Sequence, residues 1–238
     1  MTELMRRQVT GYALVNMEWR LAIQDFINHH SEEGYWEAIM SETGPTLDLY
    51  NKYGELTEQL KVSPIGSYNY EKERWTWAWA NPAFNTLQTQ KASTIKRYGA
   101  QYTFDELLNP IQQATEEEAE IYPIMATAVY GGTKPVIWLP GDSGKLCVII
   151  EDDLQLPTIT ANTFANIISL ASDLPSEIID FNQSIQDNSA QRNYSTEQQE
   201  AESIITARFD DHSFSDIAVK DNKIVSIKYS TPEIEEEG

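Results

Sequence analysis

Apolar residues near the N-terminus recur every three or four positions. In residues 3–29 this spacing includes Val9, Ala13, Trp19, Ile23 and Ile27, whereas most charged residues fall between these positions. On an α-helix such residues share one face. The pattern therefore predicts one long amphipathic helix that stops before Gly34, a residue type typical of helix ends.

A different period appears at Trp75, Trp77 and Trp79, which occupy alternate positions. Successive side chains of a strand point to opposite faces, so a spacing of two places all three indoles on one face. Residues 61–70 and 75–80 flank the polar residues 71–74, which predicts a β-hairpin that ends at Asn81-Pro82. The indole face fits either a buried core or the floor of a ligand groove.

The middle of the chain alternates between the two periods. Residues 35–40 and 46–51 are expected to be strands, and residues 136–139 and 145–150 a second hairpin. Helices are expected over residues 86–99, ending at Gly99, and from Thr115 to about Tyr130. Thr115 and Glu118 have the spacing of a capping box, and Gly131 follows the second helix.

The last third has weaker patterns. Residues 162–172 and 196–209 are predicted as helices, residues 182–195 as a polar loop or linker, and residues 215–219 with 223–229 as a closing hairpin. We therefore expect an α+β fold with a mainly antiparallel twisted sheet, a long N-terminal helix and further helices packed on one face. The expected organisation is an α+β domain of residues 1–155, an acidic α+β lobe of residues 156–232 and a disordered tail of residues 233–238.

The net charge of the chain limits the kinds of partner that the protein can bind. The 238 residues carry a formal charge of −20, and residues 151–238 alone hold 18 acids against 5 bases. Such a surface repels nucleic acid and anionic lipid and attracts basic partners, so neither a nucleic-acid nor a membrane partner is expected. The candidate partner-binding residues are Asp152, Asp153, Asp210, Asp211 and Asp216.

Residues suited to catalysis or metal binding are sparse. Cys147 is the only cysteine and lies in an apolar run, and two of the three histidines, His29 and His30, are neighbours. The cluster of Asp210, Asp211, His212 and Asp216 lacks the spacing of an EF-hand, and no nucleotide-binding glycine motif or nucleophile elbow occurs. We expect no enzyme activity, no cofactor and no metal. No run is long and apolar enough for a signal peptide or a membrane span, which predicts a cytoplasmic protein.

Two motifs carry a family resemblance. Ile65-Gly66-Ser67-Tyr68, a short charged gap and then Trp75-Thr76-Trp77-Ala78-Trp79-Ala80-Asn81-Pro82 resemble the signature of an uncharacterised bacterial domain family, in which the paired strands follow a long N-terminal helix. The resemblance covers roughly residues 1–155. Because the family has no established activity, the resemblance implies a fold rather than a function.

Two hypotheses about function follow. The first is a non-catalytic acidic binding protein, most concretely an immunity protein that neutralises a basic, nuclease-like bacterial toxin by occluding its active surface. The alternative is a small-molecule-binding domain whose pocket is formed by Trp75, Trp77 and Trp79, with Asn81 at the strand end. A metal-dependent hydrolase that uses carboxylates is a third interpretation.

Overall fold

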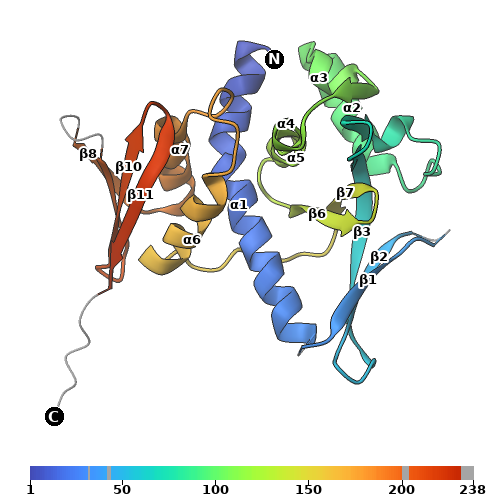
Figure 1. The fold of residues 1–238 in the computed structure, drawn as a ribbon, viewed down its shortest axis with the longest axis horizontal. Coiled ribbons are helices and arrows are strands. Elements are labelled where there is room, and N and C mark those ends of the chain that lie inside the picture. The colour runs from blue at the N-terminus through green and yellow to red at the C-terminus, as the bar shows by residue number, and fades with distance from the viewer. Residues whose placement is uncertain (32, 42–43, 200–203, 232–238) are drawn as a thin grey trace.

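The computed structural model describes residues 1–31, 33–41, 44–199 and 204–231. Its centre is α1 (Glu3–Ser31), which matches the predicted long helix and separates two antiparallel sheets (Figure 1). We call the seven-stranded sheet with its helices the first lobe, and the four-stranded sheet with its helices the second lobe. The fold class is α+β, as predicted.

The first lobe is built around one long strand, β3 (Leu56–Asn69), which pairs with β2, β4 and β7. Every pairing is antiparallel. The other strands are β1 (Tyr35–Ile39), β2 (Thr46–Tyr50), β4 (Arg74–Trp77), β5 (Ile111–Gln113), β6 (Val136–Gly141) and β7 (Gly144–Ile150). The expected strands and both hairpins of this lobe are thus present.

The helical segments of the first lobe are η1 (Ala78–Ala80), α2 (Gln90–Tyr102), α3 (Asp105–Leu108), α4 (Glu116–Ala119) and α5 (Ile121–Val129). Thr115 and Glu118 form the predicted capping box. The predicted end of α2 at Gly99 is wrong, because the helix continues to Tyr102 and is capped by Thr103 in a left-handed conformation. Gly99 instead allows close packing, since a Cβ there would lie 2.7 Å from the Cβ of Leu107.

The tryptophan motif divides between a strand and a turn. Trp75 and Trp77 lie on β4 and are fully buried, and the ring of Trp75 stacks on Tyr122 with centroids 4.5 Å apart. Trp79 lies on η1 and is partly exposed, with the Lys96 ammonium 4.1 Å from its ring centroid. The prediction of three indoles on one strand face is therefore correct for two, because the strand ends at Trp77.

Helix α1 is buried on two sides because a lobe packs against each. Asn16 is fully buried, and its Nδ2 donates to Thr127 Oγ1 (2.9 Å) and to the Val136 carbonyl (2.8 Å) in the first lobe. Glu18 faces the second lobe, where its Oε1 accepts a 2.6 Å hydrogen bond from Asn188 Nδ2. One buried polar residue thus fixes α1 to each lobe.

The second lobe has two helices, α6 (Ala161–Ala171) and α7 (Phe181–Arg192), beside a meander of four strands. In chain order the strands are β8 (Ser195–Gln199), β9 (Ile204–Arg208), β10 (Phe214–Lys220) and β11 (Lys223–Ser230). Helix α6 and the β10–β11 hairpin agree with the predictions. The predicted tail of residues 233–238 lies outside the described residues.

Two predictions for the second lobe are wrong. Residues 182–195 are not a linker: most of them form α7, whose Phe181, Ile185 and Asn188 are buried. Residues 196–209 are not a helix, because β8 and β9 pair there. Within β9, Ile205 and Ala207 belong to the hydrophobic core, so packing against the core overrides the helix-favouring composition of this segment.

Candidate functional site

The connection between the lobes is a segment without helix or strand, residues 151–160, which we call the strap; it crosses α1 (Figure 1). Two predicted site residues lie at its start. Asp152 Oδ2 accepts a 2.6 Å hydrogen bond from the Lys61 backbone amide. Asp153 pairs with the Lys134 ammonium at 2.5 Å, which lowers the pKa of Asp153. Both residues hold the strap to the first lobe, and Lys134 compensates the charge of Asp153.

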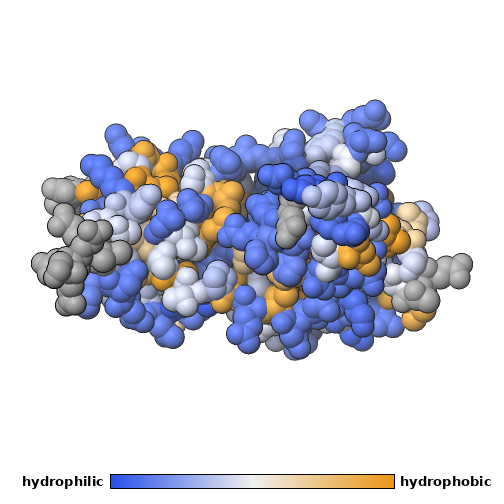
Figure 2. Space-filling view, turned by 90° about the horizontal axis from the view of Figure 1, so that it is seen from below, coloured by the Kyte–Doolittle hydropathy of each residue, from blue (hydrophilic) through white to orange (hydrophobic). Residues whose placement is uncertain are grey.

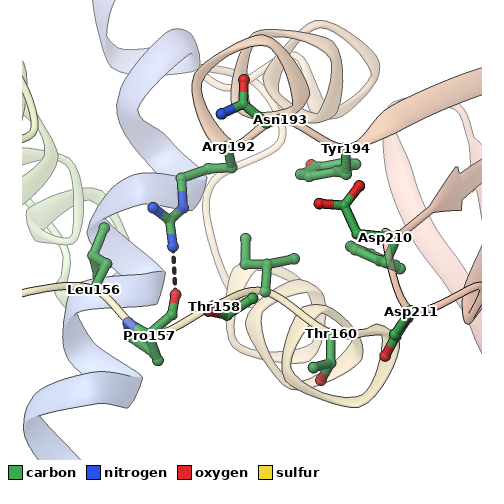
Figure 3. Close-up of a pocket in the computed structure, with 11 residues that line it drawn as sticks. Leu156, Pro157, Thr158, Thr160, Arg192, Asn193, Tyr194, Asp210 and Asp211 are labelled. Atoms are coloured by element: carbon green, nitrogen blue, oxygen red, sulfur yellow. Dashed lines mark hydrogen bonds between the residues drawn. The ribbon is translucent and has the colours of Figure 1, made fainter.

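The strap also lines one side of a cavity of about 370 Å³ on the second lobe (Figure 3). The walls come from residues 156–160 of the strap, residues 192–194 at the end of α7 and residues 209–211 between β9 and β10. Tyr194 and Phe209, which are 8% and 6% exposed, form an aromatic wall with ring centroids 5.2 Å apart. The predicted residues Asp210 and Asp211 both line this cavity.

A polar network anchors one side of the cavity to α1. Arg192 Nη2 donates to the Pro157 carbonyl at 2.6 Å (Figure 3), and its Nε lies 2.8 Å from Glu18 Oε2. The Tyr194 hydroxyl donates to Asn188 Oδ1 at 2.8 Å. Burial raises the pKa of Glu18, although Asn188 and Arg192 act in the opposite direction. The cavity wall is therefore positioned by residues of α1, α7 and the strap together.

The other side of the cavity is acidic. The Asp210 carboxylate points toward the Tyr194 ring (Figure 3), and it makes no hydrogen bond or ion pair with any described residue. Asp211 Oδ1 accepts hydrogen bonds from the hydroxyl and the backbone amide of Ser213, which lower the pKa of Asp211. Both residues follow Phe209, a buried residue that comes directly after the end of β9.

Asp216 lies apart from the cavity on β10. Its neighbours Ser215 and Ile217 are buried, so Asp216 is on the opposite face of the sheet, where its Oδ1 accepts a 2.7 Å hydrogen bond from Thr206. The structure thus brings Asp210 and Asp211 together and separates them from Asp216 and from the strap pair.

Sequence reasoning missed a further acidic pair in the first lobe. Glu37 on β1 is directly opposite Asp48 on β2, beside the stacked rings of Tyr35 and Tyr50, whose centroids are 4.9 Å apart. Burial and the carboxylates of Asp48 and Glu37 raise the pKa of Tyr50. Like charges opposite each other in a sheet are destabilising. The sequence carries a signal for this pair. If residues 35–39 and 46–50 pair as antiparallel strands, residues 35, 37 and 39 lie opposite residues 50, 48 and 46 and share one face of the sheet.

The structure also shows the surroundings of the tryptophan side chains and of Cys147. Trp75 and Trp77 present no surface to solvent, and Asn81 Nδ2 donates to Ser67 Oγ at 3.3 Å beside them. Cys147 is buried, which raises the pKa of its thiol. No group of three or more His, Cys, Asp or Glu side chains in the described parts of the chain is placed to hold a metal ion. None of the helices described here combines the length and apolar character needed to cross a bilayer.

The fold is that of an α+β protein with mainly antiparallel sheets. By sequence, the chain belongs to a family of unknown function, DUF6882, whose model matches residues 14–153. This range covers most of α1, the first lobe and the start of the strap, in agreement with the resemblance carried by the tryptophan motif. Neither a curated protein nor a solved structure matches the chain.

Proposed function

We propose that this protein is a non-catalytic binding protein for a basic protein partner, most concretely an immunity protein that neutralises a nuclease-like bacterial toxin. The supporting observation is that three of the five predicted site residues, Asp210, Asp211 and Asp216, form no ion pair with any described residue, whereas Asp153 pairs with Lys134. Asp211 and Asp216 accept hydrogen bonds from neutral hydroxyl and amide groups, and Asp210 has no described partner. A neutral donor leaves the charge of a carboxylate intact, so these groups remain available to a cationic surface.

The mechanism we propose is electrostatic steering followed by occlusion. An acidic surface accelerates encounter with a basic partner, and the attraction extends over a screening length of about 8 Å at physiological salt. A nuclease binds phosphates through a basic surface, so a protein that covers this surface excludes the nucleic acid. The exposed carboxylate of Glu37 on β1 offers a second acidic contact on the first lobe.

The character of the surface supports charge rather than one large apolar contact on the face seen in Figure 2. On that face hydrophilic residues predominate, and the hydrophobic residues form small separate patches. Specific apolar interfaces usually require a larger continuous patch. Association driven by charge predicts a strong dependence on salt.

The experiment uses a basic toxin domain encoded next to the gene of this protein. Its affinity is measured by titration calorimetry at about 50 and about 300 mM NaCl, and its nuclease activity is measured in the complex. We expect the affinity to fall with salt and the activity to be blocked. Replacing Asp210, Asp211 and Asp216 together by Asn should weaken binding by about tenfold or more.

A second triple variant controls for total charge. Asp25, Asp142 and Asp173 are exposed, and replacing them by Asn changes the net charge equally. We expect this variant to bind within about twofold of the original protein. Affinity that does not respond to salt, equal weakening by the two triple variants, or a fully active toxin in the complex would contradict the proposal.

A further inference from the structure

We propose that the cavity beneath the strap receives one lysine or arginine side chain of the basic partner. The inference rests on the proposed function for the source of this side chain. The argument for the site itself comes from the charges, the aromatic wall and the anchoring of the cavity.

The free charge of the cavity is negative. Arg192 is the only cation among the residues that line it, and Glu18 matches its charge at 2.8 Å. Asp210 and Asp211 have no cationic partner at ion-pair distance among the described residues. Figure 3 places Arg192 and Asp210 on opposite sides of the cavity, so an entering ammonium or guanidinium group would meet Asp210 and stay away from Arg192.

The apolar part of the cavity suits the stem of such a side chain. The exposed remainders of Tyr194 and Phe209 line the wall beside Asp210. Lysine and arginine bury their methylene groups against apolar surface while the charged end reaches a polar group, and aromatic rings attract cations directly. A volume of about 370 Å³ is at the small end of ligand sites, which favours a single side chain over a larger ligand.

The cavity is already held in shape before a ligand arrives. Arg192 links the Pro157 carbonyl of the strap to Glu18 of α1, and Tyr194 is fixed through Asn188. A preformed site loses little conformational entropy on binding. Such pockets commonly receive the anchor residues of an interface, among which arginine is enriched.

The test uses blocked amino acids as probes of the isolated protein. Nα-acetyl-lysine methylamide and Nα-acetyl-arginine methylamide are titrated into the isotope-labelled full chain and followed by NMR. We expect saturable shifts of the amide signals of residues 192–194 and 209–211 with at least one probe. Nα-acetyl-norleucine methylamide, which keeps an apolar stem without the charge, should bind at least about fivefold more weakly.

Two variants place the effect at one carboxylate. Asp210→Asn should weaken binding of the charged probe by about fivefold, because the unpaired carboxylate is lost while the cavity is kept. Asp142→Asn, at an exposed turn of the first lobe, should leave the affinity unchanged. Absence of saturable shifts at the cavity, equal binding of the norleucine probe, or unchanged affinity of Asp210→Asn would overturn the site.

The two proposals fail in different ways. Capture of the basic toxin that depends on salt, without binding of either charged probe, would remove this site and leave the proposed function in place. Binding of a charged probe that depends on Asp210, without capture of any basic protein, would remove the partner and leave a cation site.

Discussion

Among single residues, Glu18 places an ionisable carboxyl group in the interior, where α1 contacts the second lobe. It is 3% exposed, and its partners Asn188 and Arg192 both belong to α7. Burial nevertheless dominates and raises the pKa of Glu18. A buried carboxylate of this kind costs desolvation free energy when it ionises, even with an arginine beside it.

This predicts a pH dependence that is specific to Glu18. Because its pKa is higher in the folded protein than in the unfolded chain, its contribution to stability is complete below the ordinary pKa of about 4.3 and is lost as pH rises through the raised pKa. The free energy of unfolding of the original protein minus that of Glu18→Gln should therefore decrease as the pH rises above about 4.3. A tenfold difference in the acid dissociation constant of Glu18 between the folded and unfolded states corresponds to about 1.4 kcal/mol.

Urea unfolding at several pH values measures this difference. Glu177→Gln, at an exposed position of the second lobe, is the matched control and should give a difference that does not change with pH. A Glu18→Gln difference that stays constant or increases with pH would show that the arginine, rather than burial, controls the protonation of Glu18.

At the scale of elements, the packing of β3 against β4 depends on Gly66. This residue pairs with Trp77, and a Cβ added to it would lie 2.2 Å from Cζ2 of Trp75 and 2.8 Å from the Thr76 carbonyl oxygen. The buried Trp75 ring therefore occupies the space where a side chain would be. The glycine and the first tryptophan of the motif are one packing unit.

Gly66→Ala should consequently destabilise the protein by about 1–3 kcal/mol, since the Trp75 ring or a strand must move. The free energy of unfolding from urea titration measures the loss. Gly141→Ala is the control, because the nearest atom to its added Cβ is 3.5 Å away, an ordinary contact distance. If the two variants are equally stable, the close approach of β3 and the indole is not a constraint on the fold.

A helix or strand could be predicted from the sequence where its apolar residues recur with the regular spacing of that element. Helix α1 and the strands of the first lobe have regular apolar positions. In α7 the buried face includes Ser184 and Asn188, so its apolar period is weak. The burial of Asn188 is accompanied by hydrogen bonds to Glu18 and Tyr194, which lie outside the helix and leave no pattern within its sequence. The acidic site residues were visible in the composition. The cavity was not, because its walls meet from residues 156–160, 192–194 and 209–211.

At the scale of the whole molecule, the lobes share one hydrophobic core. A single cluster of buried residues extends from Trp75 in the first lobe, through Leu14 of α1, to Phe164 and Ile217 in the second lobe. Helix α1 contributes buried side chains from Met5 to Met17 to this cluster, whereas Ile23 belongs to a second cluster within the first lobe. A core of this kind favours cooperative unfolding of the two lobes, whereas lobes with separate cores would unfold independently.

Tryptophan fluorescence can test this cooperativity because all six tryptophans lie between residues 19 and 138, outside the second lobe. Ile217→Val, fully buried on β10, should destabilise the second lobe by about 1 kcal/mol. If the lobes unfold together, the urea midpoint reported by tryptophan falls by the amount that this loss predicts. Val225→Thr, at a 58% exposed position on β11, should leave the midpoint nearly unchanged. The opposite result has two parts: the urea midpoint from tryptophan fluorescence is the same in Ile217→Val as in the original protein, and circular dichroism shows an additional transition at lower urea. That result would mean that the second lobe unfolds alone and that α1 remains folded with the first lobe.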